Sequence, residues 1–263
     1  MYRGFLSTKD TEETRLKHAL LITGASRGIG AATAILAAQQ GWAVAVNYAS
    51  NAQAANAVVK HIQDAGGTAM AVQADVGDEA QILRMFAEVD AALGPISGLV
   101  NSAGVVDVTA KVDAQSWARW ERMMRINVLG SMACAREAVR RMSTAHGGAG
   151  GSIVNVSSAA TRLGGAGQYV DYAAAKGAID AFTIGLAKEV AAEGIRVNAV
   201  RPGLIDTEIH ASGGLPNRAR DLAHLVPMQR AGTAEEVAQA IVWLLSEASS
   251  YTTMSLMDIS GGR

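Results

Sequence analysis

The sequence predicts an α/β fold with a single, mostly parallel, seven-stranded sheet that is covered by helices on both faces. Three observations predict it. Short apolar segments alternate strictly with longer Ala-rich segments, which is the order of a doubly wound sheet. The short segments are continuously apolar, as expected for strands that are buried on both faces. The chain has 263 residues, 49% of them hydrophobic, which is enough to bury one large core.

The elements follow one another in order from residue 19. The short apolar runs predict strands at residues 19–23, 42–48, 68–73, 98–101, 152–156, 195–200 and 255–258. The longer Ala-rich runs between them predict helices near residues 28–40, 51–65, 78–93, 172–193 and 233–246, and one long helix within residues 114–142. The Gly-rich segment 146–152 is too short for a linker and predicts a surface turn. We therefore expect one domain over residues 19–263, preceded by a flexible polar extension over residues 1–18.

Composition excludes several classes of protein. A net charge of −1 gives no electrostatic footprint for nucleic acid or for an anionic membrane. The single cysteine, Cys134, can form neither an internal disulfide nor a zinc cluster. No apolar run approaches the ~18 residues of a membrane span, and no signal peptide is recognisable. We expect a cytoplasmic protein without a metal site, and with neither nucleic acid nor membrane as a partner.

A glycine-rich turn follows the first predicted strand. Gly24, Gly28 and Gly30 are spaced as Gly-x3-Gly-x-Gly and lead into a predicted helix. Glycines let the backbone approach a pyrophosphate, whose charge meets the free N–H groups of a helix start. A glycine cluster alone could simply tighten a turn, but here the strand–turn–helix context is also present. The sequence therefore predicts a dinucleotide-binding Rossmann fold.

The end of the second predicted strand bears on the choice of dinucleotide. NAD enzymes place an acidic residue there for the ribose, whereas this chain has Asn47-Tyr48-Ala49-Ser50-Asn51. Arg27, in the glycine turn, can reach the same space. These observations favour NADP(H) over NAD(H), and an Asn47→Asp change should shift the preference toward NAD(H). The alternative is that Arg27 is merely solvated and Asn47 serves either cofactor.

A tyrosine and a lysine are placed for acid–base chemistry. Tyr172 and Lys176 lie four residues apart, on one face of a predicted helix. An ammonium beside a phenol, whose ordinary pKa is ~10, favours the phenolate and lowers that pKa. Ser158 ends the preceding strand, as Gly24 and Asn101 end theirs, and ligands of doubly wound sheets bind at such ends. A Tyr–Lys spacing alone occurs by chance on many helices, so the convergence of these residues carries the argument.

Several motifs occur together in one order: Thr23-Gly24-x3-Gly28-x-Gly30, Asp75-Val76, Asn101-Ser102-Ala103-Gly104, Asn127, Ser158, Tyr172-x3-Lys176 and Arg201-Pro202-Gly203. Over residues 20–262 the sequence resembles the short-chain dehydrogenase/reductase family. It is most similar to the classical bacterial subgroup, which includes 3-oxoacyl-carrier-protein reductases and glucose 1-dehydrogenase-like proteins. Three departures from the family pattern stand out: Ser102 replaces an Asn, Met254 replaces a customary Gly, and the serine-to-tyrosine spacing is one residue longer than usual. This spacing leaves open whether Ser157 or Ser158 is the catalytic serine, and we choose Ser158.

The resemblance implies a role for each residue. Tyr172 would exchange the proton with the substrate oxygen, and Ser158 would hold that oxygen. Lys176 would lower the pKa of Tyr172 and bond the nicotinamide ribose. Asn127 would position Lys176 through a water, although it could instead be a buried, bonded amide. The implied cofactor-binding set is Gly24, Ser26, Arg27, Gly28, Ile29, Gly30, Asn47, Tyr48, Asp75 and Val76 (adenine), Asn101, Ala103 and Gly104 (adenosine side), Tyr172, Lys176, and Pro202, Gly203, Ile205 and Thr207 (nicotinamide carboxamide).

A substrate loop is expected at about residues 204–226, where turn-forming residues suit a mobile lid. His210, Arg218 and Arg220 could bind an anionic substrate there, but solvated surface charge is the favoured interpretation. The family resemblance also implies a homotetramer that pairs helices around residues 114–142 and 173–193.

The expected function is NADP(H)-dependent hydride transfer between the nicotinamide and a secondary alcohol or ketone. The open alternatives are a 3-oxoacyl-thioester reductase or a glucose-type sugar dehydrogenase and, in another class, a non-catalytic NADP-binding regulatory protein.

Overall fold

The computed structural model describes residues 18–263, apart from the side chains of His210 and Ser212. Except for His18, the predicted extension lies outside these residues. The described residues form a seven-stranded sheet in the order β3-β2-β1-β4-β5-β6-β7. Each of the six pairings is parallel, so the sheet is wholly rather than mostly parallel. The strands are β1 Ala19–Thr23, β2 Ala43–Tyr48, β3 Thr68–Gln73, β4 Ile96–Asn101, β5 Gly151–Val156, β6 Ile195–Pro202 and β7 Leu256–Ile259.

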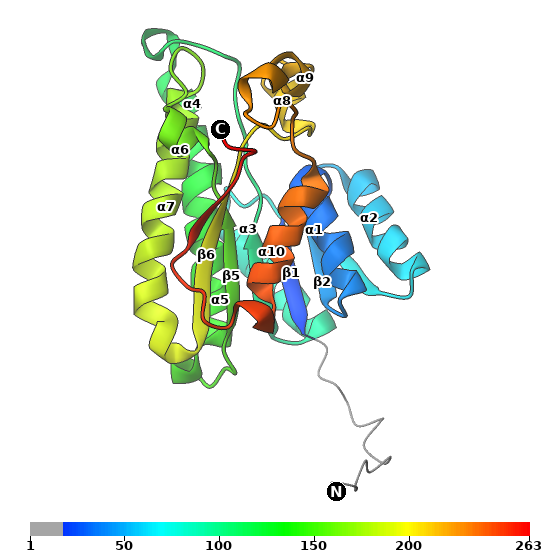
Figure 1. The fold of residues 1–263 in the computed structure, drawn as a ribbon. Coiled ribbons are helices and arrows are strands. Elements are labelled where there is room, and N and C mark those ends of the chain that lie inside the picture. Colours follow the sequence, from blue (N-terminus) through cyan, green and yellow to red (C-terminus); the bar gives the residue numbers. More distant parts are fainter. Residues whose placement is uncertain (1–17) are drawn as a thin grey trace, which may run out of the picture.

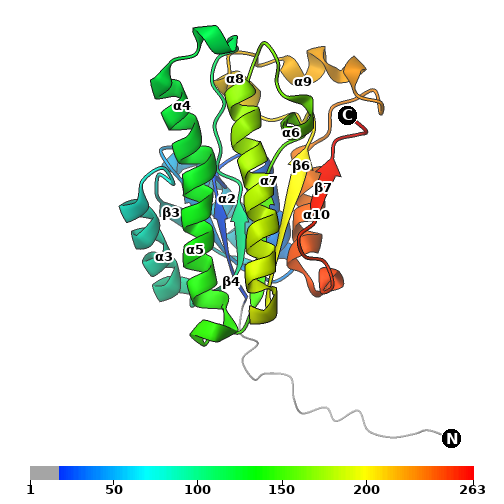
Figure 2. The same ribbon diagram turned by 90° about the vertical axis from the view of Figure 1, so that its left-hand side faces the viewer.

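The helices form two layers, one on each face of the sheet (Figures 1 and 2). One layer holds α1 Gly28–Gln39, α2 Ala52–Asp64 and α10 Ala234–Leu245. The other holds α3 Glu79–Leu93, α5 Gly130–Met142 and α7 Val170–Val190. Two short helices, α8 Ile209–Ser212 and α9 Arg218–Asp221, stand beyond the carboxyl ends of the strands in both views. The predicted doubly wound fold is confirmed.

Helix starts show why the predicted boundaries are close but offset. Residues 51, 78 and 233 were predicted as the first residues of three helices, and each is the N-cap instead. Asn51 accepts a hydrogen bond from the N–H of Ala54, and Asp78 accepts one from that of Gln81. Thr233 forms a full capping box with Glu236. A side-chain oxygen at this position satisfies a helix N–H that has no partner within the helix, so these residues fix where each helix begins.

The long helix predicted within residues 114–142 is present as a continuous helical run over residues 117–142, but a π-helical turn interrupts its α-helical pattern. The segment is divided into α4 Trp117–Met124, a π-helical turn at Arg125–Leu129, and α5. A π-turn inserts an extra residue and rotates the faces of the helix on either side of it. The turn brings Gly130 against the chain that follows β3, where an added Cβ would lie 2.5 Å from the carbonyl oxygen of Val76. No periodicity in the sequence marks this insertion.

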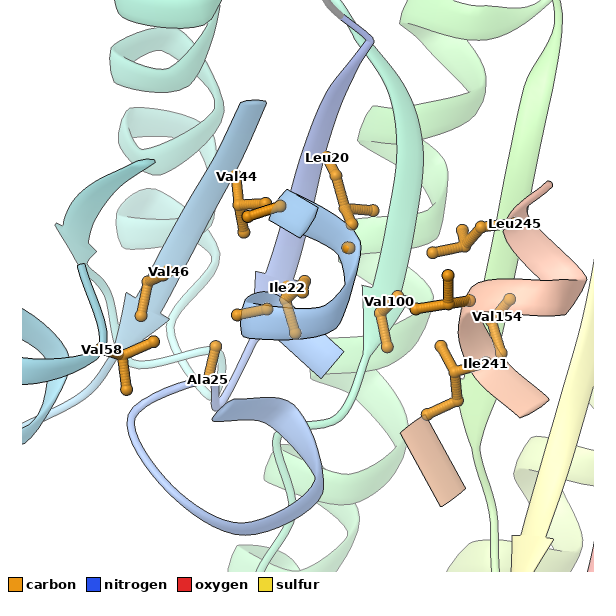
Figure 3. Packing of buried hydrophobic residues seen from close by; sticks show 14 of the residues in the cluster. Leu20, Ile22, Ala25, Val44, Val46, Val58, Val100, Val154, Ile241 and Leu245 are labelled. Carbon is orange, nitrogen blue, oxygen red and sulfur yellow. The ribbon is translucent and has the colours of Figure 1, made fainter. Parts of the chain in front are cut away.

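The core consists of two apolar clusters, one on each side of the sheet. Figure 3 shows the first, in which side chains of β1, β2, β4 and β5 meet those of α2 and α10. The second gathers around Phe86 of α3, one of the largest fully buried side chains. Small aliphatic residues fill most of both clusters, as the low aromatic content implies. Among the described helices, none is long and apolar enough to cross a bilayer.

Met254 adopts a backbone conformation that L-residues avoid. Its φ is +65°, and its N–H donates to the carbonyl of Val197 at 2.7 Å. A side chain costs about 1–2 kcal/mol in this region, whereas glycine pays little there. We therefore expect Met254→Gly to raise the free energy of unfolding by about 1 kcal/mol in urea titrations. Ser255→Gly, next to it at an ordinary φ, should lower stability; equal effects of the two changes would contradict the argument.

Candidate active site

A cavity of about 930 Å³ lies at the carboxyl ends of the strands, where the strand order reverses between β1 and β4. Doubly wound sheets bind ligands at this switch point. The loops after β1, β2, β3, β4, β5 and β6 all contribute to its wall. Of the predicted site residues, the structure brings these to the wall: Gly24, Ser26, Arg27, Gly28, Ile29, Gly30, Asn47, Tyr48, Asp75, Val76, Ala103, Gly104, Ser158, Tyr172, Lys176, Pro202, Gly203, Ile205 and Thr207.

The glycine turn is tight enough to exclude any side chain at two of its positions. Gly24 has a φ of +63°, and a Cβ there would lie 2.7 Å from the Cα of Ala103. A Cβ on Gly30 would lie 2.5 Å from the carbonyl oxygen of Gly24. The hydroxyl of Thr23 accepts hydrogen bonds from the N–H groups of Ser102 and Ala103, which ties the turn to the loop after β4. The turn therefore holds the start of α1 at the cavity, as a pyrophosphate site requires.

Asn47 serves the backbone more than the cavity. The residue is 1% exposed, and its Oδ1 accepts from the N–H of Gly24 at 3.1 Å. Its Nδ2 donates to the carbonyls of Val72 and Ala74. A carboxylate here would face two carbonyl oxygens without a proton to give them. The expectation that Asn47→Asp shifts the cofactor preference is therefore revised, because this change would strain the scaffold. The exposed positions that follow, Ala49 and Ser50, line the same cavity.

Asn101 lies in the interior, away from the cavity wall. Its Nδ2 donates to Oδ1 of Asn155 at 3.0 Å and to the carbonyl of Ser131 at 3.1 Å. Asn155 in turn donates to the hydroxyl of Thr183. This buried polar chain joins β4, β5, α5 and α7. The Nδ2 of Asn101 is thus used inside the fold, and Asn101 is absent from the cavity wall; its place on the adenosine side stays a prediction.

Asn127 is also held away from the cavity wall, within the π-turn. Its Oδ1 accepts from the N–H of Val105 at 2.9 Å, and its Nδ2 donates to the carbonyl of Val105 at 3.0 Å. Gly104 lies between it and the lysine, because a Cβ there would be 2.9 Å from the Asn127 Oδ1 and 3.6 Å from the Lys176 Nζ. The buried, bonded amide that the sequence left as an alternative describes the side chain of Asn127.

Ser158, Tyr172 and Lys176 meet in the cavity. Both Ser158 and Tyr172 line the cavity, and the Ser158 hydroxyl is close enough to the phenol to lower its pKa. The Lys176 ammonium lies 5.7 Å from the centre of the Tyr172 ring and donates to the carbonyl of Val156 at 2.6 Å. Ser157 is turned inward instead, where its hydroxyl donates to the carbonyl of Lys176 at 3.3 Å. The geometry therefore favours Ser158 over Ser157 as the partner of the tyrosine.

Burial dominates the acid–base properties of this group. It raises the pKa of Tyr172 from 10 to about 12, while the side chain of Ser158 lowers it. Burial also lowers the pKa of Lys176 to about 8, against the charge of Asp180, which raises it. In each case burial favours the uncharged form of the side chain, because a buried charge loses its hydration. Tyr172 therefore holds its proton at neutral pH.

The buried ammonium of Lys176 should destabilise the folded chain at neutral pH. The pKa of Lys176 in the folded chain, about 8, lies below the ordinary 10.5. Between these two pH values the unfolded chain binds more protons than the folded chain. The contribution of Lys176 to the free energy of unfolding therefore rises as the pH increases from 8 to 10.5. We expect Lys176→Met to be more stable than wild type by up to about 3 kcal/mol at pH 7. The difference should shrink between pH 8 and pH 10.5 in urea titrations. Lys188→Met, at an exposed lysine of the same helix, should change stability by less than about 0.5 kcal/mol.

A buried ion pair fixes the start of the tyrosine helix. Arg119 of α4 binds Asp171 of α7 with both ends of its guanidinium, Nε to Oδ2 at 2.7 Å and Nη2 to Oδ1 at 3.1 Å. Its third contact runs from Nη1 to the carbonyl of Val108. Both side chains are less than a tenth exposed. The hydrogen bond with Asp171 raises the pKa of Arg119, so the guanidinium stays charged. No local sequence signal links these two residues, which lie 52 positions apart.

Other wall residues were not predicted. They include Tyr169, one turn before Tyr172, and Leu163 of α6 (Ala160–Leu163). Arg218 of α9 also reaches the cavity, whereas Arg220 is exposed and lies 3.5 Å from Asp221. In the described part of the chain, no three His, Cys, Asp or Glu side chains gather closely enough to hold a metal ion.

The chain is similar to known proteins over nearly its whole length. The model of a family described as enoyl-(acyl carrier protein) reductase matches residues 24–263. An uncharacterized oxidoreductase, YgfF of Escherichia coli, is 55% identical over 92% of this chain and 98% of its own. Cis-4-hydroxycyclohexanecarboxylate dehydrogenase of Sinomonas cyclohexanicum is 39% identical over 92% of this chain and 94% of its own. A solved short-chain dehydrogenase/reductase from Serratia marcescens superposes with a TM-score of 0.86 at 31% identity, covering 95% and 99% of the two chains.

Proposed function

Because this chain belongs to the short-chain dehydrogenase/reductase family, we propose that it is an NADP(H)-dependent oxidoreductase that interconverts a secondary alcohol and a ketone. The family is one of oxidoreductases that act on CH–OH groups with NAD(P). The observation that carries the proposal is the meeting of Ser158, Tyr172 and Lys176 in one cavity with the glycine turn.

The residues present fit a dinucleotide. Gly24 and Gly30 allow the tight turn that holds the start of α1 at the cavity, and this helix start offers N–H groups to a pyrophosphate. Asp75 and Val76 would hold the adenine. Residues after β6 would hold the nicotinamide carboxamide, namely Pro202, Gly203, Ile205 and Thr207. When bound, the nicotinamide supplies or accepts the hydride.

The chain's own residues would handle the proton and the substrate oxygen. The hydroxyls of Ser158 and Tyr172 would both donate to the carbonyl oxygen. Tyr172 would then pass its proton to this oxygen during reduction, which its raised pKa permits because the phenol is protonated at neutral pH. The nearby Lys176 ammonium would stabilise the phenolate that remains. In oxidation the same groups act in reverse.

Two features favour NADP(H) as the cofactor. The chain after β2 continues as Tyr48-Ala49-Ser50-Asn51, without the carboxylate that would bind an unphosphorylated ribose. Arg27 and Ser50 line this end of the cavity. A cation and a hydroxyl at the place of the usual acid suit a 2′-phosphate.

Ala49→Asp should reverse this preference. A carboxylate at this exposed position would accept hydrogen bonds from the ribose 2′-hydroxyl and repel a 2′-phosphate. We expect the ratio of kcat/KM with NADPH to kcat/KM with NADH to fall by about tenfold to a hundredfold, equivalent to ~1.4–2.8 kcal/mol. Ala49→Asn, of the same shape without charge, should leave the ratio within about threefold. A wild-type enzyme that already prefers NADH would contradict the cofactor assignment.

A substrate panel tests the activity itself. The oxidation of NADPH would be followed by absorbance with 4-oxocyclohexanecarboxylate, the ketone related to the Sinomonas relative's named substrate, and with a 3-oxoacyl thioester. Glucose with NADP⁺ tests the sugar dehydrogenase alternative. We expect reduction of ketones outside the thioester class. Tight NADPH binding without turnover on any member would favour the regulatory alternative.

We also propose that the chain is cytoplasmic and forms a homotetramer, with residues 204–226 as the substrate loop. Large apolar side chains are exposed along the α4–α5 segment, among them Trp117 at 70% and Leu129 at 59%. Contiguous exposed apolar residues of this size favour a protein interface. Light scattering during size-exclusion chromatography should give the mass of four chains, and Trp117→Glu should reduce it.

A further inference from the structure

Charge is distributed unevenly over the cavity wall. Among the described residues that line it, the carboxylates are Asp75 and Glu208. Asp75 follows β3, at the nucleotide end. Glu208 lies near the glycine turn, with its Oε2 3.7 Å from where a Cβ on Gly28 would be. The described wall therefore has more arginines than acidic side chains, because Arg27, Arg122, Arg218 and Arg263 also line it.

Of these arginines, Arg218 stacks on an aromatic side chain. Its guanidinium lies over the ring of Tyr169, 5.3 Å from the ring centre, and Tyr169 is one turn before Tyr172. Among the described residues Arg218 takes part in no ion pair. The neighbouring wall arginine differs, because Arg122 binds Asp107 at 3.3 Å.

Arg218 is half-buried and lies beside a small apolar cluster. Ala219, next to it, is buried in a small cluster with Leu204 and Val226. The wall of the same cavity also includes the apolar side chains of Leu163, Val106 and Ile209. A guanidinium stacked on an aromatic face keeps its planar edge free for two parallel hydrogen bonds, which match a carboxylate. Because Arg218 is half-buried, such a bond would compete with less water than one at a fully exposed arginine.

We propose that the substrate carries a carboxylate on an apolar body, and that Arg218 binds this carboxylate while the carbonyl lies at Ser158 and Tyr172. The inference rests on the proposed function for the position of the carbonyl. The sequence favours solvated surface charge for both Arg218 and Arg220. The exposed Arg220 still fits that interpretation, whereas the proposal assigns Arg218 to the substrate. The aromatic ring of Tyr169 would orient the guanidinium from behind.

Matched ligands test the site without requiring turnover. Cyclohexanecarboxylate and the neutral cyclohexanecarboxamide would be titrated by calorimetry into the NADP⁺-loaded protein. We expect the carboxylate to bind at least tenfold more tightly than the carboxamide. Arg218→Gln should remove this difference by weakening the carboxylate about tenfold to a hundredfold. Arg220→Gln, two residues away on the same helix and outside the cavity wall, should preserve it.

Kinetics provide the second measurement. With 4-oxocyclohexanecarboxylate and its carboxamide as substrates, Arg218→Gln should raise the KM of the keto acid alone and leave the Kd of NADPH unchanged. Equal binding of both ligands by the wild type, or a preference that survives in Arg218→Gln, would overturn the carboxylate site. So would a loss confined to NADPH affinity, which would place Arg218 at the cofactor. If the protein preferred the carboxylate ligand but reduced no ketone, the carboxylate site at Arg218 would stand and the oxidoreductase activity would be rejected.

Discussion

Tyr172→Phe is expected to lower kcat/KM for ketone reduction by about 10²–10⁴-fold, the usual contribution of a positioned proton donor. The change removes one oxygen and leaves the ring against its apolar neighbours. The oxygen is the group that Ser158 contacts and the one that holds a proton at neutral pH, with its pKa raised to about 12. Because the glycine turn and the loops after β2 and β3 are untouched, the Kd for NADPH should stay within about twofold. Stopped-flow reduction and fluorescence titration would measure the two quantities.

Tyr169→Phe is the matched control for this experiment. Tyr169 lines the same cavity one helical turn earlier, and its variant also loses a single hydroxyl. That hydroxyl lies against Gly213 of the substrate loop rather than beside Ser158. We expect less than a tenfold change in kcat/KM. If both variants reduced ketones at similar rates, Tyr172 would not be the proton donor.

Asp171→Ala is expected to lower the free energy of unfolding by about 3–5 kcal/mol, the largest stability effect that the structure suggests. The change leaves the guanidinium of Arg119 buried without its carboxylate partner, since that side chain is 8% exposed. The contact from Arg119 to the carbonyl of Val108 remains but cannot offset a whole charge. Urea titrations at one protein concentration would measure the loss, because assembly also contributes to apparent stability.

The double variant Arg119→Met with Asp171→Leu tests whether the loss in Asp171→Ala comes from an unpaired charge or from lost packing. Both charges disappear together, and apolar side chains of comparable length occupy the space. Buried ion pairs replaced in this way often lose little stability, because no unpaired charge is left. We expect the double variant to recover at least half of the loss seen in Asp171→Ala. A double variant as unstable as the single one would show that packing, not charge, is what Asp171 provides.

The sequence predicted those parts of the site that depend on neighbours along the chain. The glycine turn, the Tyr172–Lys176 spacing and the apolar strands are all local patterns, and the structure brings them together at the carboxyl end of the sheet. The positions of Asn101 and Asn47 could not be predicted in this way. Their amides bond to backbone and side-chain groups that are 23–54 residues distant, and only the folded sheet determines which of these groups are nearby.

The acid–base balance of the site was also hidden from the sequence. The spacing of Tyr172 and Lys176 suggested a lowered tyrosine pKa, whereas burial raises it. Spacing shows which side chains share a helix face but not how far both are removed from water, and here the loss of hydration dominates. The π-turn that holds Asn127 could not be predicted for a related reason. It depends on contacts with Val76 and Val105, which lie outside its own segment.

The buried amide of Asn47 affects which positions around the cavity can be substituted without loss of stability. It joins the glycine turn to the end of β3, so the scaffold that holds a dinucleotide depends on a buried residue. The side chains that face the ribose end of the cavity belong to the next, exposed positions, Ala49 and Ser50. Mutations at those positions cost the fold little, whereas a change at Asn47 would be removed by selection for stability. Under the proposed cofactor assignment, we therefore expect the dinucleotide preference to change through single substitutions at Ala49 or Ser50 with little loss of stability.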